Sequence, residues 1–435
     1  MSDVSRGASA SEEPQRGRRR TAVVGSGVAG LTAAYVLARD HHVTLLEADD
    51  RLGGHAHTHE LTSRDGTTRH VDSGFIVHNR RTYPELLRLF RELGVSTQES
   101  EMSMSVRCEG CGLEYAGARG PAGLFAQPRN ALRGAYLRML AEVPVFHRAA
   151  RRHLARPDES AMTLGAFLDR QGFSPYFRTH FMTPVVSAVW SCGAATAQRY
   201  PAAYLFRFLE HHGMLSVSGS PTWRTVTGGS RAYVERVAER LDAVRPATGV
   251  RAVRRHPGGV DVTTHDGVTE SYDAVVVATH PDQALSLLAD ATPREKEVLG
   301  AFRYSRNTTL LHTDTALLPR ARGARASWNY LMPSCRAGSD RVRVSYDMNR
   351  LQRLDAPEHY VVSLGAEDRV APERVLARMV YEHPVYTPES VAAQRRLPEL
   401  NTSVTAFAGA YHGWGFHEDG CRAGVTAAAA LGVRW

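Results

Sequence analysis

The segment that most constrains the fold is Gly25-Ser26-Gly27-Val28-Ala29-Gly30, a G-x-G-x-x-G motif. An apolar stretch, Arg20–Val24, precedes it, and a helical pattern, Val28–Arg39, follows it. A second apolar stretch, His42–Glu47, completes a strand–helix–strand unit. In such a unit the glycines make a tight turn, let backbone approach a pyrophosphate and let the helix pack closely on the strand. The helix N-terminus then offers its unpaired N–H groups to the phosphates.

An acidic residue stands where this unit needs one. Glu47 lies 22 residues after Gly25, at the end of the second strand. A carboxylate at that place can accept hydrogen bonds from ribose hydroxyls, and it disfavours the 2′-phosphate of NADP. The sequence therefore predicts a dinucleotide-binding domain. The uncharged run Thr21–Ala38 belongs to this domain by the same argument, and we do not interpret it as a membrane span.

Composition is that of an ordinary soluble globular protein. The chain has 435 residues, of which 43% are apolar and 23% charged, so two or three domains are expected from its length. Five scattered cysteines indicate a reducing compartment rather than a disulfide framework. Residues 1–20 are polar and lack the apolar segment of a signal peptide. The protein is therefore predicted to be cytoplasmic.

The remaining pattern alternates between short strands and helices. Expected strands are His57–Ser63, Thr67–Asp72, Gly249–Arg255, Gly259–Thr264, Asp273–Thr279 and Val404–Gly409. Expected helices are Thr82–Leu93, Asn130–Leu154, Thr163–Arg170, Pro175–Trp190, Tyr200–His211, Ser230–Leu241 and Gly420–Leu431. A second hairpin is expected just after Glu101, before the long helical segments. This order fits two domains that interleave along the chain.

Further motifs distinguish FAD from NAD as the cofactor. They are Arg51-Leu52-Gly53-Gly54, Asp72-Ser73-Gly74-Phe75, Thr227-Gly228-Gly229-Ser230, and Phe407-Ala408-Gly409 with the segment 413–420. Together they resemble the flavin-containing amine oxidase and phytoene desaturase superfamily, over most of residues 20–433. Within it, the chain is most similar to bacterial FAD-dependent oxidoreductases often found near cyclopropane-fatty-acid-type methyltransferases.

The resemblance implies non-covalent FAD, held between the N-terminal unit and the C-terminal helix. That helix, beginning near Glu418–Gly420, would aim its N-terminal N–H groups at the flavin, although turn and capping glycines explain the motif as well. The implied cofactor contacts are Gly25, Ser26, Gly27, Ala29, Gly30, Glu47, Arg51, Gly53, Gly54, His55, Gly74, Val253, Gly409, Phe416, His417 and Glu418.

The resemblance also implies a fold class and a division of the chain. The fold class is α/β, with a Rossmann-like FAD-binding domain interleaved with an α+β substrate domain. A disordered tail is expected at 1–19. The FAD-binding domain is expected at 20–98, 226–300 and 401–435, and the substrate domain at 99–225, mostly helical, and 301–400.

The chain departs from the amine oxidases in several features of the site, among them the paired tyrosines that flank an amine, which are not recognisable here. Classical members place a lysine near flavin N5 from a strand of the substrate domain, and the matching strand here, Arg306–His312, contains none. Lys296, the only lysine, lies in a charged helical stretch and is expected to face solvent. No cysteine matches a covalent flavin link, because Cys421 lies within the terminal helix. Amine oxidation is therefore disfavoured, whereas flavin binding is not.

These observations lead to a predicted activity with open alternatives. The protein is expected to desaturate or isomerise an unsaturated fatty acyl or other lipid-like substrate by hydride transfer to flavin. Amine oxidation, carotenoid-type polyene desaturation and isomerisation without net redox change remain alternatives. The catalytic residue is unassigned, with His417, Tyr411 and Trp414 as the candidates.

Two patterns suggest metal sites, and neither is favoured. His55, His57 and His59 alternate and would share one face of a strand. They directly follow the glycine pair, so a contact of His55 with the cofactor is preferred. Cys108-Glu109-Gly110-Cys111 has C-x-x-C spacing, but the other cysteines form no second pair, so a hairpin turn is preferred to a zinc or redox site. No metal is expected.

The partners expected are a small lipid-like molecule and an anionic membrane surface. The segment Asn130–Arg156 is basic and carries an apolar stripe, formed by Leu132, Tyr136, Leu140, Val143 and Phe146. Such a helix can lie on anionic lipid at the inner face of the membrane, or pack on the protein with solvated arginines. No nucleic-acid module is recognisable, and the oligomeric state is not predicted.

Overall fold

The computed structural model describes residues 17–156, 162–216, 219–336 and 341–435. Most of the tail expected at 1–19 lies outside these residues. Its last residue, Arg19, is instead the first of strand β1 (Arg19–Val24), because it pairs with His41 on the neighbouring strand.

A five-stranded parallel sheet forms one end of the molecule. Its order is β10 (Ala243–Arg245), β2 (His41–Leu46), β1, β14 (Ala274–Val277) and β20 (Thr405–Phe407), and every neighbouring pair is parallel. Strand β14 and the last three residues of β1 are buried and apolar, as expected for a sheet with both faces covered.

Two helices pack closely beside this sheet. Helix α1 (Val28–Leu37) is buried almost all round, and α15 (His417–Ala430) lies against it. The contact is close because α15 presents glycines: a Cβ on Gly424 would lie 2.4 Å from the carbonyl oxygen of Ala29, and one on Gly420 would lie 2.6 Å from a methyl carbon of Val28. The last helix is thereby held beside the N-terminal glycine motif.

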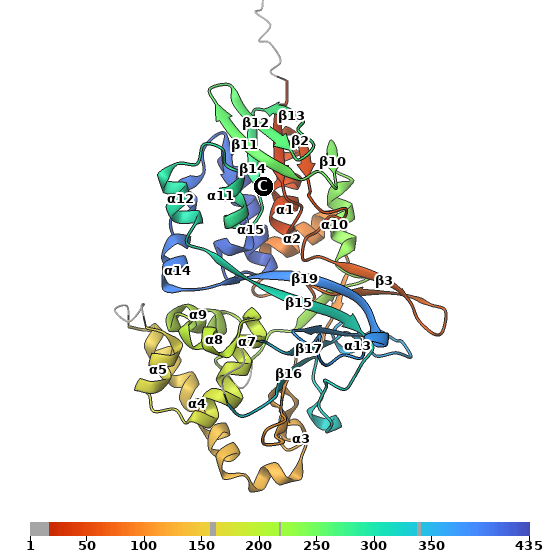
Figure 1. Ribbon diagram of the computed structural model, residues 1–435, viewed down its shortest axis with the longest axis vertical. Coiled ribbons are helices and arrows are strands. Elements are labelled where there is room, and N and C mark those ends of the chain that lie inside the picture. Colours follow the sequence, from red (N-terminus) through yellow and green to blue (C-terminus); the bar gives the residue numbers. More distant parts are fainter. Residues whose placement is uncertain (1–16, 157–161, 217–218, 337–340) are drawn as a thin grey trace, which may run out of the picture.

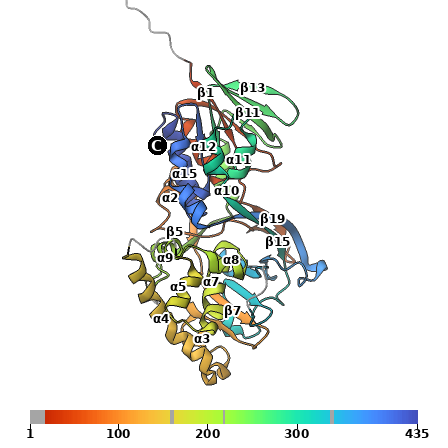
Figure 2. The ribbon, with the colours of Figure 1, turned by 60° about the vertical axis from the view of Figure 1, so that its left-hand side comes forward.

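A seven-stranded sheet forms the centre of the other half. Its order is β19 (Val375–Val385), β15 (Arg303–His312), β18 (Val361–Leu364), β17 (Val344–Asp347), β16 (Trp328–Met332), β7 (Met104–Cys108) and β8 (Glu114–Ala116). Strands β15 and β19 are the longest and lie between the two ends of the molecule (Figure 1). Figure 2 shows the same division from the side.

The remaining elements cover these two sheets. Smaller sheets contain β3 (Thr58–Thr62) with β4 (Thr68–Asp72), β5 (His78–Asn79) with β9 (Trp223–Val226) and β6 (Thr97–Glu99), and β11 (Val250–His256) with β12 (Gly259–Thr264) and β13 (Thr269–Tyr272). The other helices are α2 (Pro84–Leu93), α3 (Gly120–Leu124), α4 (Gly134–Leu154), α5 (Leu164–Arg170), α6 (Pro175–Phe177), α7 (Thr183–Trp190), α8 (Ala194–Arg199), α9 (Ala202–His211), α10 (Arg231–Ala238), α11 (Pro281–Leu287), α12 (Pro293–Leu299), α13 (Met348–Leu351) and α14 (Pro388–Gln394).

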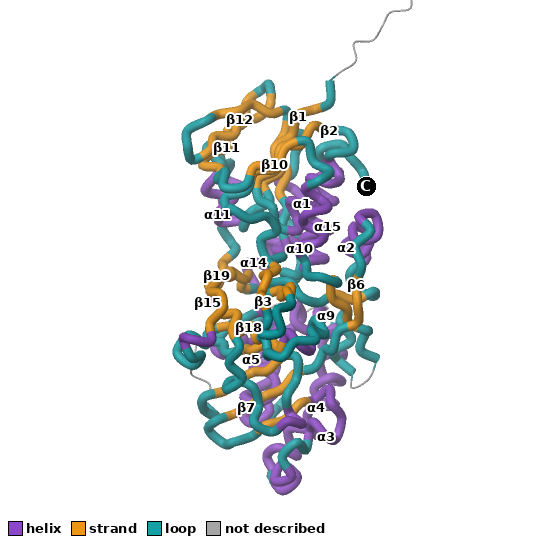
Figure 3. Tube along the Cα trace, turned by 90° about the vertical axis from the view of Figure 1, so that its right-hand side faces the viewer, coloured by secondary structure: helices purple, strands orange, loops and turns teal. Residues whose placement is uncertain are grey.

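The fold is α/β, with the parallel Rossmann-like part interleaved with an α+β part. The parallel sheet takes its strands from residues 19–46, 243–277 and 405–407, and the seven-stranded sheet takes its strands from 104–116 and 303–385. Figure 3 shows α1, α10 and α15 on one side of β15 and β19, and α3 and α4 at the far end. The exact domain boundaries remain a prediction.

Among the expected helices, three differ from those observed for a clear structural reason. The helix expected from Asn130 begins only at Gly134, because Arg133 has extended backbone after a 3₁₀ turn, Pro128–Leu132. The stretch Pro175–Trp190 is interrupted by a π-helical turn, Arg178–Met182. The last helix begins three residues before Gly420, because the side chain of its third residue, Asp419, caps it by accepting hydrogen bonds from preceding backbone amides.

Most of the apolar stripe expected on α4 packs against the protein, whereas contact of this segment with lipid stays a prediction. Tyr136 and Phe146 are buried, and Phe146 packs against Phe167 and Phe206 in the aromatic core of the helical layer. Only Leu132, which precedes the helix, is largely exposed, at 89%. None of the helices in the described part of the chain combines the length and the apolar character needed to cross a membrane.

Candidate functional site

The glycine motif lies at the carboxyl ends of the parallel strands. Gly25 has φ +98°, and a Cβ there would lie 2.9 Å from the carbonyl oxygen of Ala278, just after β14. A Cβ on Gly30 would lie 1.9 Å from the carbonyl oxygen of Gly25. A Cβ on Gly27 would meet nothing within 4 Å. The fold itself therefore requires Gly25 and Gly30, whereas Gly27 borders open space at the N-terminus of α1.

The strand order places this loop where α/β sheets bind ligands. The chain passes from β1 to β2 on one side of β1, and β14 lies on the other side. Ligands bind at such a switch point, outside the carboxyl ends of the strands. Gly25, Glu47 and Ala278 follow β1, β2 and β14 directly and therefore lie at this edge.

Glu47 ties the loop together. One of its carboxylate oxygens accepts hydrogen bonds from the backbone N–H (2.8 Å) and the hydroxyl (2.5 Å) of Ser26, and the other accepts one from the backbone N–H of Asp49 at 3.0 Å. Each carboxylate oxygen has further acceptor capacity. Glu47 is also partly exposed, so the position expected for ribose recognition is occupied by a carboxylate that is already oriented.

A second glycine loop packs on the first. Gly53 has φ +106°, and its backbone N–H donates to the hydroxyl (3.0 Å) and to the carbonyl oxygen (3.1 Å) of Ser26. A Cβ on Gly54 would lie 3.2 Å from Cα of Gly27. The Arg51 guanidinium donates to the carbonyl oxygen of Gly54 at 2.8 Å, which closes the turn. The two loops form a backbone cradle.

Two of the other motifs support the segment that follows this cradle. A Cβ on Gly74 would lie 2.2 Å from the carbonyl oxygen of His55, and the backbone N–H of Phe75 donates to that oxygen at 2.7 Å. The buried carboxylate of Asp72 accepts hydrogen bonds from the Thr58 hydroxyl (2.6 Å) and the Ser230 backbone N–H (2.9 Å). Burial raises the pKa of Asp72 to about 6.

His55 lies at the junction of the cradle with strand β19. Its Nε2 atom is buried and has no hydrogen-bond partner among the described residues. Its ring centroid lies 4.9 Å from that of Tyr381 and 5.4 Å from that of His383. Burial, followed by the nearby His383 and His280, lowers the pKa of His55 well below its usual value. A neutral imidazole nitrogen is therefore left for a ligand.

The strands β15 and β19 bring polar groups that no motif predicted. The Asn307 amide on β15 lies 2.9 Å from Nδ1 of His383 on β19. Burial lowers the pKa of His383 to about 4. The ring of His280, which precedes α11, stacks on Tyr304 at 4.0 Å. Asn307 and His383 come from segments of ordinary composition, and the pairing of the two long strands brings them together.

The other two alternating histidines are already partnered. His57 Nδ1 lies 2.9 Å from the Tyr381 hydroxyl, and His59 Nε2 lies 2.8 Å from the Ser73 hydroxyl. Burial lowers the pKa of His57 to about 3 and that of His59 to about 4. Their hydrogen bonds tie the cradle to β19.

The C-terminal motif contributes two rings, those of Trp414 and Phe416, to an aromatic cluster. The carbonyl oxygen of Gly413 accepts hydrogen bonds from the hydroxyls of Tyr204 (2.7 Å) and Tyr386 (2.8 Å) and from the Gln394 amide (2.7 Å). The Trp190 indole N–H donates to the carbonyl oxygen of Trp414 at 3.1 Å, whereas the indole N–H of Trp414 is buried without a partner among the described residues. We define the aromatic cluster by its rings, which are those of Trp190, Tyr204, Phe208, Tyr386, Trp414 and Phe416.

His417 and Glu418, which directly follow Phe416 in the sequence, have partners within the protein. The ring of His417 stacks on Phe75 at 3.6 Å, and its Nε2 lies 3.0 Å from the Tyr233 hydroxyl. Burial lowers the pKa of His417 to about 3. Glu418 accepts hydrogen bonds from the backbone amides of Glu85 (3.1 Å) and Leu86 (3.0 Å) in the first turn of α2. Burial raises its pKa to about 7.

The other expected contact residues are spread around this region. Ala29 is buried in α1. Tyr411 is buried beside Gly409, where a Cβ would lie 2.2 Å from its ring. Val253 on β11 is fully buried, and its carbonyl oxygen accepts a hydrogen bond from the backbone N–H of Ala289 at 3.0 Å. The only lysine, Lys296, is exposed on α12, as the sequence predicts.

The arrangement fits a dinucleotide cofactor. The cradle offers the N-terminal amides of α1 next to open space at Gly27, which suits a pyrophosphate. The unpartnered nitrogens of His55 and Trp414 suit the polar edges of a ring system. The packing of α15 on α1 places the C-terminal motif beside the N-terminal glycine motif, although the two are far apart in the sequence.

Comparisons with known proteins agree with this interpretation. The model of the family described as flavin containing amine oxidoreductase matches residues 28–312. The carotenoid phi-ring synthase of Streptomyces griseus is 32% identical over 288 residues, which cover 62% of this chain and 54% of that protein. This chain spans about half of the length of the curated relatives that it matches.

Solved structures share the fold at low sequence identity. A fatty acid isomerase from P. acnes that produces CLA superposes with a TM-score of 0.67 at 18% identity, covering 93% of this chain and 97% of that one. Cyclohexylamine oxidase from Brevibacterium oxydans superposes with a TM-score of 0.67 at 16% identity, covering 95% and 98%.

Proposed function

Because the chain belongs to the flavin-containing amine oxidoreductase family, we propose that it is an FAD-dependent oxidoreductase acting on a lipid-like substrate. The observation that carries this proposal is the convergence of both glycine loops with the first turn of α15 at the carboxyl edge of the parallel sheet. The cofactor is the part of the proposal on which every other part depends.

The residues of the cradle would hold FAD without a covalent bond. The amides after Gly27 would bind the pyrophosphate, and Glu47 would accept hydrogen bonds from the ribose. His55 and the loop at Trp414 would border the ring system, since their buried nitrogens lack partners in the described chain. When bound, FAD accepts a hydride from a substrate carbon and so permits the formation of a new double bond.

The chain itself would position the substrate and exclude water. His383 on β19 and Asn307 on β15 hydrogen-bond to one another, and the ring of His383 lies 5.4 Å from that of His55 in the cradle. Because burial lowers the pKa of His383 to about 4, this imidazole is neutral at pH 7 and is a weak base, which suits a hydrogen bond to substrate rather than general acid–base catalysis. We assign His383 as a candidate substrate-positioning residue, and His417, Tyr411 and Trp414 stay the predicted candidates for catalysis.

The environment favours an apolar substrate over an amine. The aromatic cluster supplies apolar walls, and the carboxylates beside it are already paired. Asp419 accepts hydrogen bonds from the backbone amides of Trp414 and Phe416 and from Arg422, and Glu418 accepts them from two amides of α2. These two carboxylates are therefore not free to pair with the ammonium group of an amine substrate. The match to a carotenoid phi-ring synthase supports the same class.

Reduction of the bound flavin under anaerobic conditions tests this proposal. Unsaturated fatty acids, phospholipids, polyenes and simple amines are each mixed with the holoenzyme, and the loss of flavin absorbance is followed. We expect lipids or polyenes to bleach the flavin or to be isomerised at unchanged mass. Loss of two hydrogens from the product identifies desaturation. Rapid bleaching by amines alone would refute the lipid-like substrate.

The same proposal includes peripheral contact with an anionic membrane. Exposed apolar side chains lie on and before α4, at the end of the molecule remote from the cofactor cradle; they are Phe125 (36%), Leu132 (89%), Leu137 (41%) and Val145 (43%). Arg148 and Arg152 on α4 are exposed beside them. Side chains of these two kinds suit shallow insertion with electrostatic attraction to headgroups.

Liposome sedimentation tests this contact. Leu132→Ser, or Arg148→Glu with Arg152→Glu, should reduce binding to anionic liposomes by at least about tenfold, and added salt should weaken binding by the wild type. Val268→Ser is the matched control, because Val268 is 52% exposed on the β12–β13 turn at the opposite end of the molecule. Wild-type protein that does not bind, or equal binding by all variants, would refute the contact.

A further inference from the structure

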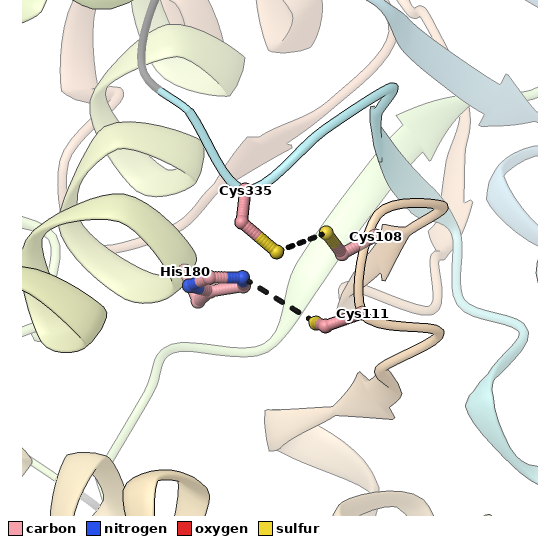
Figure 4. A group of neighbouring side chains, drawn as sticks. All are labelled: Cys108, Cys111, His180 and Cys335. Carbon is pink, nitrogen blue, oxygen red and sulfur yellow. Dashed lines mark hydrogen bonds between the residues drawn. The ribbon is translucent and has the colours of Figure 1, made fainter.

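Four potential metal ligands meet at one edge of the seven-stranded sheet. Cys108 is the last residue of β7, and Cys111 lies in the turn that leads to β8, where the sequence predicted a hairpin turn. Cys335 follows β16, which pairs in parallel with β7. His180 lies in the π-helical turn between α6 and α7. Figure 4 shows the four side chains pointing toward one another, and their ligand atoms all lie within 4.8 Å.

The distances approach those of a tetrahedral site. Sγ of Cys108 lies 3.6 Å from Sγ of Cys335, and Sγ of Cys111 lies 3.6 Å from Nε2 of His180. A tetrahedral zinc ion, with bonds of about 2.3 Å to sulfur and about 2.0 Å to nitrogen, holds such atoms about 3.5–3.8 Å apart. Two edges of the tetrahedron therefore already have about their ideal length, and no other edge exceeds its ideal length by more than about 1.3 Å.

The histidine is oriented as a metal ligand should be. Nδ1 of His180 lies 3.3 Å from the carbonyl oxygen of Tyr176, and the ring stacks on that of Tyr176 at 3.9 Å. A proton on Nδ1 is donated to this carbonyl, which leaves the lone pair of Nε2 directed at the cysteines. Metal-binding histidines are typically held in this way by a hydrogen bond from their second nitrogen.

The turn between the two cysteines is closed by a backbone hydrogen bond, which the N–H of Cys108 donates to the carbonyl oxygen of Leu113 at 2.8 Å. A Cβ on Gly110 would lie 2.8 Å from the backbone nitrogen of Cys335, so this glycine permits the loop of Cys335 to approach.

The charge of the site is partly balanced by an arginine. Three thiolates and a neutral imidazole around Zn²⁺ carry a net charge of −1. The Arg133 guanidinium donates to the carbonyl oxygen of Cys111 at 3.0 Å and thus lies beside the thiolates. Cys335 is exposed, which gives an ion a path to the site, whereas Cys108 and His180 are buried.

We propose that Cys108, Cys111, His180 and Cys335 bind one structural Zn²⁺. Binding releases the thiol protons to solvent and involves no redox change. Four protein ligands close the coordination sphere, as in structural rather than catalytic zinc sites. The ion would join the sheet to the helical layer. Helix α7, which begins three residues after His180, ends at Trp190, whose indole contacts the loop at Trp414.

Metal analysis of the purified full-length protein tests the site. After dialysis in metal-free buffer, we expect about one equivalent of zinc per chain, and X-ray absorption should give three sulfur neighbours at about 2.3 Å and one nitrogen at about 2.0 Å. Cys335→Ser, at an exposed position, should lower zinc affinity at least about tenfold in competition with a chelator. Cys111→Ser should do the same.

Matched controls separate metal binding from folding. Cys192→Ser and Cys421→Ser alter buried cysteines outside the cluster and should keep the zinc. Flavin content is measured in every variant, so loss of zinc with retained flavin marks a local effect. The proposal is overturned if reduced wild-type protein takes up no zinc at micromolar concentration, if Cys335→Ser keeps full affinity, or if the intact mass shows a disulfide instead.

Discussion

Replacement of Gly27 by valine separates cofactor binding from folding. A Cβ on Gly27 meets no atom within 4 Å, and the residue has φ −61°, so a side chain fits the folded chain without strain. The same side chain would fill the space through which a pyrophosphate reaches the amides of α1. The variant should therefore fold but fail to bind FAD.

The size of the effect follows from the hydrogen bonds that are lost. Each N–H bond to a charged phosphate contributes about 1.5–3 kcal/mol, so the loss of two costs about 3–6 kcal/mol. This raises the Kd for FAD by about 100- to 20,000-fold. Because replacing a favoured N-cap residue with an apolar one typically costs about 1 kcal/mol, the free energy of unfolding of the apo-protein should fall by about this amount.

Gly30→Ala is the contrasting variant. Its Cβ would lie 1.9 Å from the carbonyl oxygen of Gly25, so the apo-protein itself should lose about 1–3 kcal/mol or more of stability. Fluorescence titration of each apo-protein with FAD, together with urea denaturation, measures both quantities. Wild-type affinity in Gly27→Val would refute the placement of the pyrophosphate, and an unfolded Gly27→Val would refute the claim of open space.

Two further predictions concern packing and pH. Gly424→Val places a side chain where a Cβ would lie 2.4 Å from the carbonyl oxygen of Ala29. This variant should lower the free energy of unfolding, measured by urea denaturation, by about 1–3 kcal/mol and release flavin. The control Thr426→Ala, at an exposed position on the same helix, should change the free energy of unfolding by less than about 0.5 kcal/mol. An equal loss in both variants would contradict the close packing of α15 on α1. Burial lowers the pKa of His78 to about 4, so at pH 5 the unfolded chain binds a proton there that the folded chain does not, and stability falls as pH drops below about 6.5. His78→Phe should therefore gain about 2 kcal/mol over the wild type between pH 7.5 and pH 5, and a parallel pH profile in urea denaturation would contradict this.

The local parts of the account could be predicted from the sequence. The motif from Gly25 to Gly30, with Glu47 at its proper distance, specifies a strand, a turn and a helix from neighbouring residues alone. Each of its glycines has a separate role in the structure. The α/β class and the interleaving of its parts follow from the order of such local patterns.

The contacts that depend on distant pairing could not be predicted. His383 and Asn307 meet because β15 and β19 pair along their lengths. Cys335 reaches Cys108 across 227 residues of sequence, and His180 reaches Cys111 across 69. Spacing along the chain carries no sign of either contact. The sequence favoured a turn at Cys108–Cys111 because no second cysteine pair is present. In the structure, His180 and Cys335 lie beside these two cysteines, so a group of four potential ligands forms without a second pair.

The visible spectrum of the purified protein tests the central claim most directly. The account predicts a yellow protein with the absorbance of oxidised flavin, about one FAD per chain, released into solution on denaturation because no covalent bond holds it. Treatment of the stripped protein with FAD should restore the colour. A folded, colourless protein that cannot be reconstituted with FAD would contradict the account.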